Sequence, residues 1–275
     1  MGEGRPVTGL VSVVTLTRNR PGALERAMAS VAAQAGVEVE HVVIGDDCPF
    51  LSDESHVAKL RTSFPSAVIR NVSARELRDG GMEGDGYLPS KLAHLRNLGI
   101  EMSRGDMVAQ LDDDNAFRPG HLRSLRRILD EDPDVQVAHS WRNLLDAAGR
   151  PYLPDGEDPW HPDPDRRRSS YAHLRDLGVF EDGSNVVRDT LTARGQIVCR
   201  VDTSEFLVRR ELHRRIPFPV HYTRWRRRLE FTEDMAFSHE LIKQKIRVEC
   251  SRKATLDYYM GGYSNLGGLG TEDRP

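Results

Sequence analysis

The sequence predicts an α/β fold in which a mostly parallel sheet is flanked by helices. Two observations carry this prediction. The first half of the chain alternates short apolar runs with stretches whose apolar residues recur every three or four positions. Polar residues, several of them acidic, follow three of the apolar runs, at the strand ends where open α/β sheets bind ligands.

The alternation predicts the first three strands directly. Pro21 suits the first turn of the helix after the first strand, and Ser52 is a candidate cap for the next helix. The expected elements are a strand at 10–16, a helix from Pro21, a strand at 39–44, a helix at 53–61, a strand at 67–72 and a polar, glycine-rich loop at 73–88.

The same pattern continues to about residue 140. Pro89 opens a stretch in which Leu92, Leu95 and Leu98 recur at helical spacing, and Gly105 turns the chain into the next strand. The expected elements are a helix from Pro89, a strand at 107–111, a helix with Leu122, Leu125 and Leu129 on one face, and a strand at 135–140.

The second half of the chain follows a different pattern. Prolines and a run of acids interrupt regular structure over 150–190, which we expect to be an irregular insertion over one end of the sheet. A helix is expected at 232–245, with strands at Val248 and 255–259. The glycine-rich tail 261–275 is expected to be flexible.

Composition excludes several classes of protein. With 38% hydrophobic residues and a net charge of -3, the chain is neither disordered nor basic enough for general nucleic-acid binding. No apolar stretch approaches the roughly 20 residues of a membrane span, and residues 1–6 lack a signal-peptide core, so a cytoplasmic protein is expected. Cys48, Cys199 and Cys250 are too scattered for a disulfide framework or a zinc cluster.

Three strand ends carry the candidate binding residues, which should face one crevice. The third end is an acidic triplet whose carboxylates repel one another, and a hard divalent cation, Mn²⁺ or Mg²⁺, would neutralise them. Alternatively, the triplet is a solvated turn that caps the next helix. The candidates are Thr15, Thr17, Arg18 and Asn19 after the first strand, Asp46 and Asp47 after the second, and Asp112, Asp113 and Asp114 after the fourth.

Four segments, in order along the chain, resemble motifs of the family 2 glycosyltransferases of the GT-A fold. The segment 11–21 resembles their opening strand, and Asp46-Asp47 resembles their nucleotide-base motif. The segment 96–99 and the triplet after Leu111 are similar to their run into the metal-binding Asp-x-Asp. The segment Thr232-Glu233-Asp234-Met235 resembles the Glu-Asp motif that carries their catalytic base.

The resemblance implies an inverting, metal-dependent glycosyltransferase of the hexosyltransferase class. Its donor would be a nucleotide sugar, a UDP-sugar by family frequency. A metal ion held by Asp114 and Asp112 would stabilise the leaving diphosphate as a Lewis acid. Asp234 would take the proton of the acceptor hydroxyl as that hydroxyl attacks the anomeric carbon.

The resemblance also assigns the nucleotide contacts. Asp46 or Asp47 would accept a hydrogen bond from the base, Asp113 would contact the ribose, and Arg96 would approach the base or the phosphates. Arg18 stands where relatives commonly have a tyrosine that packs on the base, and its planar guanidinium could stack there instead.

Asp234 also has a purely structural interpretation. Thr232 followed by Glu233 and Asp234 is what a helix start prefers, with a capping hydroxyl and then acids near the positive end of the helix dipole. Glu233 is expected to orient the site or to pair with an arginine.

The resemblance implies one GT-A domain over 1–275. Within it, 7–141 would bind the nucleotide sugar, and 142–260, with the insertion and a small mixed C-terminal part, would bind the acceptor. Because no membrane segment is present, a soluble acceptor such as a natural product, peptide or saccharide is expected.

Nine arginines and three acids lie between Arg200 and Arg228. The arginines of 209–228 could meet a diphosphate or an acidic acceptor, or they could form a solvated, ion-paired face. Trp160, amid prolines and acids, is a candidate lid residue, although most tryptophans are packed core.

Two other functions compete with sugar transfer. A non-catalytic nucleotide-sugar-binding protein would not need Asp112, Asp114 and Asp234 together, so the presence of all three counts against this alternative. A sugar nucleotidyltransferase would need a glycine-rich loop after the first strand, where this chain has the segment 16–20, Leu-Thr-Arg-Asn-Arg.

Overall fold

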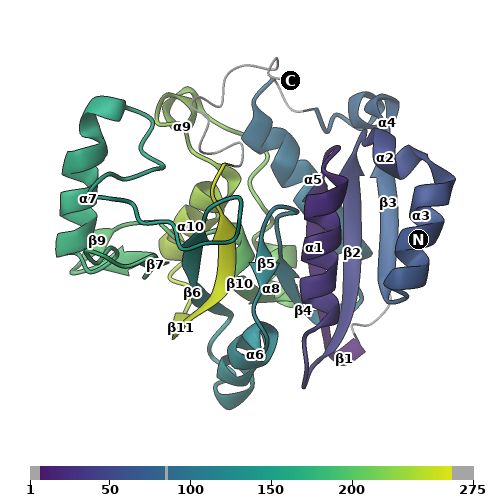
Figure 1. Ribbon diagram of the computed structural model, residues 1–275, viewed down its shortest axis with the longest axis horizontal. Helices are drawn as coiled ribbons and strands as arrows, with labels where there is room; N and C mark the ends of the chain where they lie inside the picture. The colour runs from purple at the N-terminus through teal and green to yellow at the C-terminus, as the bar shows by residue number, and fades with distance from the viewer. Residues whose placement is uncertain (1–6, 84–85, 262–275) are drawn as a thin grey trace.

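The computed structural model describes residues 7–83 and 86–261 (Figure 1). Its strands are β1 (Val7–Thr17), β2 (Glu38–Asp46), β3 (Ala67–Val72), β4 (Gly105–Gln110), β5 (Ala116–Phe117), β6 (Val137–Leu145), β7 (Val186–Val187), β8 (Thr192–Ala193), β9 (Gln196–Ile197), β10 (Phe206–Arg209) and β11 (Val248–Tyr259). Its α-helices are α1 (Pro21–Ala32), α2 (Pro49–Ser52), α3 (Glu54–Ser63), α4 (Ala74–Asp79), α5 (Leu88–Met102), α6 (His121–Glu131), α7 (Arg167–Asp176), α8 (Arg210–Arg215), α9 (Arg224–Arg228) and α10 (Glu233–Lys243). Two 3-10 turns complete the elements, η1 (Pro164–Arg166) and η2 (Thr203–Glu205).

One mixed sheet runs through the molecule in the order β3-β2-β1-β4-β10-β6-β11-β5, with β7 paired to β6. The strands β3, β2, β1 and β4 are parallel, β10 runs antiparallel to both β4 and β6, and β11 is parallel to β6. Because β10 comes from the second half and lies between two strands of the first, both halves of the chain contribute to one sheet.

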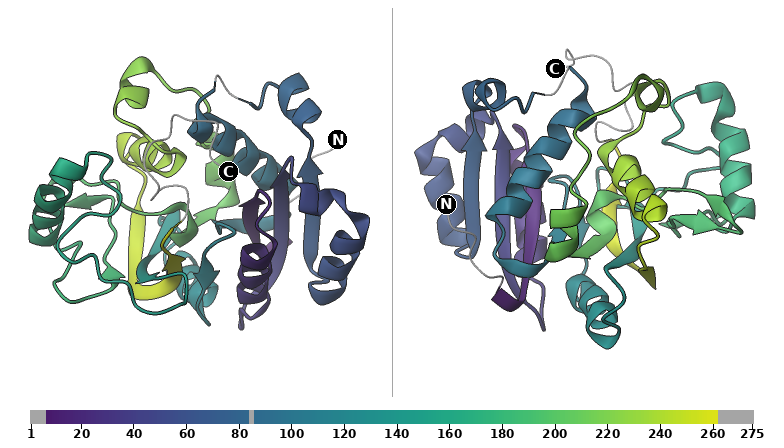
Figure 2. Two further views of the ribbon diagram at one scale, coloured as in Figure 1. Left: turned by 45° about the horizontal axis from the view of Figure 1, so that its top comes forward. Right: turned by 180° about the vertical axis from the view of Figure 1, so that it is seen from behind.

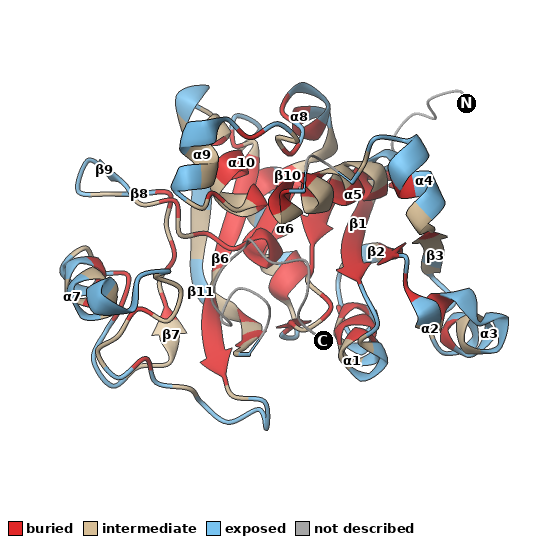
Figure 3. Ribbon diagram, turned by 90° about the horizontal axis from the view of Figure 1, so that it is seen from above, coloured by how far each residue is buried: buried red, intermediate tan, exposed pale blue. Residues whose placement is uncertain are grey.

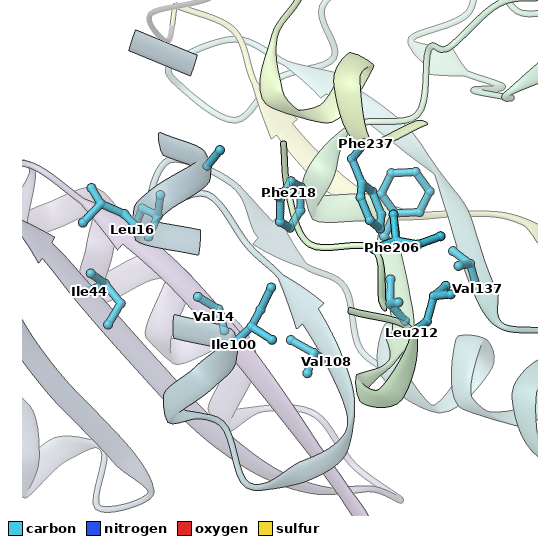
Figure 4. Close-up of a cluster of buried hydrophobic side chains, with 14 of the residues drawn as sticks. Val14, Leu16, Ile44, Ile100, Val108, Val137, Phe206, Leu212, Phe218 and Phe237 are labelled. Carbon is cyan, nitrogen blue, oxygen red and sulfur yellow. The ribbon is translucent and has the colours of Figure 1, made fainter. Parts of the chain in front are cut away.

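Helices cover both faces of this sheet (Figure 2). On one face, side chains from α5, α8 and α10 pack on β1, β2, β4, β6 and β10, as Figure 4 shows for Val14, Phe206 and Phe237. On the other face, α1 and α6 pack on β1, β4 and β10. Gly99 allows α5 to lie close to β1, because a Cβ at this position would stand 2.3 Å from Val14 Cγ1. The predicted helix-flanked, mostly parallel sheet is therefore confirmed.

The strands predicted at 10–16, 39–44 and 67–72 are confirmed as β1, β2 and β3, and β1 is buried from Leu10 onward because helices cover both its faces. The loop predicted at 73–88 was wrong, because it contains α4. Ser73 and Glu76 form a capping box that starts this helix.

Two further expectations need correction. The cap of α3 is Asp53, whose side chain accepts a hydrogen bond from Ser55 N, and not Ser52. The insertion 150–190 is not wholly irregular, because it contains α7 and β7. The expected flexible tail lies, from residue 262 on, outside the described residues.

No helix in the described parts of the chain combines the length and the apolar character that a bilayer span requires.

Candidate active site

The acidic triplet follows β4 and is paired with two arginines. Arg20, just before α1, lies 2.5 Å from Asp113 and 2.7 Å from Asp114. Arg96, on α5, lies 2.7 Å from Asp112. The triplet, for which a divalent cation was expected, is thus also paired with two guanidinium groups that are distant in the sequence.

The three carboxylates differ in their access to solvent. The Asp113 side chain is fully buried and accepts a hydrogen bond of 2.7 Å from the Thr17 hydroxyl. Burial raises the pKa of Asp113 to about 6. The side chains of Asp112 and Asp114 are 29% and 21% exposed. Only these two can therefore meet a ligand directly, and the residue that the resemblance assigns to the ribose is covered.

Arg96 connects the triplet to the start of α10. Its buried guanidinium lies 2.7 Å from Asp112 and 2.9 Å from Glu233. Burial alone would lower the pKa of Arg96, but the charges of Asp112 and Glu233 raise it. The expectation that Glu233 pairs with an arginine is confirmed, and the pairing brings the end of β4 beside the helix that carries Asp234.

Asp234 lies at the first turn of α10. The Thr232 hydroxyl and the Met235 backbone N–H, the latter at 2.8 Å, both donate to Asp234 Oδ1. Burial and the adjacent charge of Glu233 raise the pKa of Asp234 to about 6. The carboxylate is thus oriented through one oxygen.

Asp46 is paired with a lysine that sequence reasoning missed. Lys91 Nζ, on α5, lies 2.7 Å from Asp46 Oδ1, whereas the mostly exposed Arg18 lies 3.9 Å from Asp46 Oδ2. Lys91 could have been predicted from the sequence, because it falls near the start of the helix predicted from Pro89. This end of the helix lies beside the ends of the strands.

Asp47 and Asn19 serve the backbone geometry of the loops. Asp47 has a φ of 44° and its carboxylate accepts a hydrogen bond of 2.9 Å from Ala74 N, at the start of α4. Asn19 has a φ of 53°, and its N–H donates to Cys48 Sγ at 3.3 Å. Asparagine and aspartate tolerate this left-handed conformation better than most residues.

The structure does not place the Thr15 side chain beside the other candidate binding residues. Its hydroxyl lies 2.8 Å from His41 Nε2, and both side chains are buried between β1 and β2. Burial lowers the pKa of His41 to about 3, so this imidazole is neutral.

A second buried charge cluster, which joins β6 to the end of the insertion and to the start of η2, was not predicted. Arg142, on β6, lies 3.0 Å from Asp189 and 3.2 Å from Asp202, and the buried Glu205 lies close enough to affect its pKa. Trp160 packs on the Arg142 guanidinium, with 4.3 Å between the guanidinium carbon and the ring centroid. The candidate lid residue is thus half-buried against this cluster.

The second cluster lies close to the active-site region, because the charge of Arg142 acts on Asp234. Burial raises the pKa of Asp202 to about 6, Arg142 opposes the rise, and the negative charges of Asp112 and Asp234 add to it. Asp202 therefore lies near both the triplet and α10. Within residues 7–83 and 86–261, no group of three or more His, Cys, Asp or Glu side chains is placed to hold a metal ion.

Several proteins resemble the chain over part of their length. An uncharacterized glycosyltransferase of Haemophilus influenzae is 29% identical over 130 residues, which are 47% of this chain and 38% of that protein. The succinoglycan biosynthesis protein ExoO of Rhizobium meliloti is 32% identical over 115 residues, which are 42% of this chain and 28% of that protein. The chain spans less than two thirds of the length of either relative.

Solved structures share the fold over nearly the whole chain. Staphylococcus aureus TarS in complex with UDP matches with a TM-score of 0.56 at 17% identity, covering 92% of this chain and 61% of that one. Mannosyltransferase PcManGT from Pyrobaculum calidifontis, in complex with GDP-Man and Mn²⁺, matches with a TM-score of 0.57 at 15% identity, covering 93% and 58%. Residues 90–178, which include Arg96 and the triplet, match the model of glycosyl transferase family 2. Over residues 90–178 the chain therefore resembles glycosyl transferase family 2, and its fold is the one that TarS and PcManGT share.

Proposed function

We propose that this protein transfers a sugar from a nucleotide-diphosphate donor to a hydroxyl group of an acceptor, with inversion at the anomeric carbon. In this proposal residues 7–141 bind the donor, and residues 142–260 bind an acceptor such as a natural product, peptide or saccharide. The observation that carries the proposal is the pair of contacts of Arg96, which joins a carboxylate at the end of β4 to the first residue of α10.

The proposed reaction needs one proton acceptor. The acceptor oxygen forms a bond to the anomeric carbon while the bond from that carbon to the diphosphate oxygen breaks, and the diphosphate leaves with the electron pair. Asp234 takes the hydroxyl proton. Its Oδ1 is held by Thr232 and Met235, so Oδ2 is the atom we assign to the proton.

The triplet can take part in binding a divalent cation. Asp112 and Asp114 each use one carboxylate oxygen for an arginine, which leaves the second oxygen of each for Mn²⁺ or Mg²⁺. Two carboxylates suffice for Mg²⁺, which usually completes its coordination with substrate phosphates and water. When bound, the ion would supply Lewis-acid stabilisation of the leaving diphosphate. The presence of Mn²⁺ with PcManGT supports this part of the proposal.

The pairing of Asp46 with Lys91 supports a choice of base. A carboxylate acceptor and an ammonium donor lie 2.7 Å apart on β2 and α5. Uracil and guanine present an N–H donor beside a carbonyl oxygen, which complements such a pair. Cytosine and adenine present an amino donor beside a ring-nitrogen acceptor, which would fit the same pair with the two partners exchanged. We propose that Asp46 faces the ring N–H and Lys91 the carbonyl oxygen, which selects a uridine or guanosine diphosphate sugar, with UDP as the first choice. The UDP bound to TarS and the GDP-Man bound to PcManGT support this order.

A thermal-shift panel tests the proposal. UDP-, GDP-, CDP- and ADP-sugars are each added with and without Mn²⁺, and the unfolding midpoint is measured. A ligand at about 100 times its dissociation constant stabilises by about 2.7 kcal/mol. We expect a metal-dependent shift with a UDP- or GDP-sugar and none with CDP- or ADP-sugars. No shift with any nucleotide would contradict donor binding, and a shift without later release of free nucleotide in the presence of acceptors would favour a non-catalytic binding protein.

A further inference from the structure

The short helix α9 exposes apolar and cationic side chains together. Trp225 and Leu229 are 56% and 49% exposed. Arg224 and Arg228 are also exposed, and neither has an ion pair or a hydrogen bond within the part of the chain that the structure describes. Figure 3 shows much of α9 in the colour of exposed residues.

The helical spacing arranges these four residues as two adjacent stripes. Residues four positions apart are neighbours on a helix surface. Arg224 therefore lies beside Arg228, and Trp225 lies beside Leu229, one position further round the helix. The two stripes together are called the α9 surface below.

The other arginines of α9 are occupied. Arg226 lies 2.7 Å from Glu240 on α10, and Arg227 donates a hydrogen bond of 3.2 Å to the Tyr222 carbonyl oxygen. These contacts hold α9 against the body of the protein, so the α9 surface is presented on a fixed support.

We propose that the α9 surface docks on a lipid bilayer that carries anionic phospholipids. Exposed Trp and Leu beside exposed arginines match the chemistry of the membrane interface, where aromatic and aliphatic side chains enter the acyl boundary and cations meet the headgroups. Four side chains are too few for a stable protein interface, which buries about 800 Å² on each partner. A bilayer needs no complementary shape, so it suits so small a patch.

The helix α9 lies at the same end of the molecule as the carboxyl ends of the parallel strands. Figure 1 shows α9 at the upper end of the molecule, where α2 and α4 follow the carboxyl ends of β2 and β3. The first residue of α10 follows Leu229 by only four positions, and Asp234 comes next. A docked bilayer would lie beside the candidate active site. The docking itself does not depend on the proposed reaction.

Vesicle flotation tests the proposal on the full chain. Vesicles of phosphatidylglycerol and phosphatidylcholine in equal parts are compared with pure phosphatidylcholine vesicles, at low and high salt. We expect binding to the anionic vesicles alone, weaker at high salt because salt screens the charges. Equal binding to both vesicles, or none to either, would overturn the proposal. Binding to a soluble anionic polysaccharide without vesicle binding would also overturn it, in favour of a polyanionic partner.

Paired variants locate the surface. Each basic residue near an anionic bilayer contributes about 1 kcal/mol, a factor of about five. The double variant Arg224→Gln/Arg228→Gln should therefore lower the partition coefficient about 25-fold. The control is Arg123→Gln/Arg127→Gln, which removes two exposed arginines at the same spacing from α6, at the lower end of the molecule in Figure 1. It should change the partition coefficient less than twofold, and an equal loss in the control would overturn the assignment.

The apolar stripe is tested separately. Trp225→Ser/Leu229→Ser should also abolish flotation while the unfolding midpoint and UDP binding stay near the wild-type values. Because the Trp225 ring contacts Phe231, with 5.4 Å between centroids, this variant could lose stability, and the arginine pair then decides the question. Unchanged flotation in a folded Trp225→Ser/Leu229→Ser variant would contradict insertion of this stripe.

Discussion

Two buried arginines organise the molecule, and they do so differently. Arg96 joins the end of β4 to α10, and its partner Asp112 is 29% exposed to solvent. Arg142 joins β6 to Asp189 and Asp202, whose side chains are 0% and 10% exposed. The first cluster opens on the candidate active site, whereas the second, which includes Asp189 of the insertion, is closed to solvent. A buried ion pair can thus serve a site or support a scaffold, and the exposure of its carboxylates distinguishes the two uses.

The largest expected effect is on the closed cluster. Arg142→Met removes the cation between buried carboxylates, so the free energy of unfolding should fall by about 3–5 kcal/mol in urea denaturation. Arg150, whose side chain is 78% exposed and pairs with Asp146 at 2.8 Å, provides the control. Arg150→Met should leave the urea midpoint nearly unchanged. A loss below 1 kcal/mol in Arg142→Met would show that the cluster is not a scaffold.

The closed cluster should also make stability depend on pH. Burial raises the pKa of Asp189 and of Asp202 to about 6, and it also raises the pKa of Glu205 well above its usual value. These groups bind protons more tightly in the folded state than in the unfolded state, so lowering the pH from 7 to 5 should raise the free energy of unfolding, by about 2 kcal/mol. Urea denaturation at both pH values measures the gain.

The double variant Asp189→Asn/Asp202→Asn isolates this contribution. Its gain in the free energy of unfolding between pH 7 and pH 5 should be smaller than that of the wild type, because two titrating carboxyl groups are removed. The gain should not vanish, because Asp113 and Asp234, whose pKa values are also raised to about 6, still titrate in this range. Lower stability of the wild type at pH 5 than at pH 7 would contradict the assignment.

The open cluster should respond to a change in cation binding. Arg20 lies 2.7 Å from Asp114, so it competes with any metal ion for that carboxylate. Arg20→Gln should bind Mn²⁺ about tenfold more tightly in a calorimetric titration without donor, an effect of about 1.4 kcal/mol. Arg26 is the matched control, because it donates to the Asp114 backbone carbonyl at 3.0 Å. Arg26→Gln should change the affinity less, and unchanged or weaker Mn²⁺ binding in Arg20→Gln would remove Asp114 from the metal site.

The smallest effect concerns the base. Lys91→Met removes one donor beside Asp46, so the dissociation constant of UDP should rise about three- to tenfold, the value of one hydrogen bond. Equilibrium titration with UDP and CDP measures it, and the preference for UDP should shrink. Arg18→Gln, which changes a mostly exposed side chain 3.9 Å from Asp46, should have a smaller effect. A full preference for UDP in Lys91→Met would exclude Lys91 from base selection.

Local patterns predicted the elements of the first half well. The run 10–16 is apolar because β1 is covered on both faces, so its length and composition predict a buried strand. The helix α4 could also have been predicted, since Ser73 and Glu76 have the spacing of a capping box. The strand β10, four residues long within an arginine-rich stretch, has no such local pattern, because its burial depends on β4 and β6 beside it.

The candidate site was predictable in its carboxylates but not in their cations. Strand ends placed the triplet near Asp46, because parallel strands end at one edge of a sheet. Arg20 and Arg142 pair with acids far away in the sequence, and nothing in a single sequence links such residues. The charge that was expected from a metal ion is therefore partly supplied by the protein.

The central claim is that Asp234 removes the proton from the acceptor hydroxyl. The decisive measurement compares Asp234→Asn with the wild type, taking the dissociation constant of the nucleotide sugar and the rate of transfer from the same preparation. We expect an unchanged dissociation constant and transfer slowed at least about 100-fold, as the loss of a general base requires. Near-wild-type transfer by Asp234→Asn would contradict the claim.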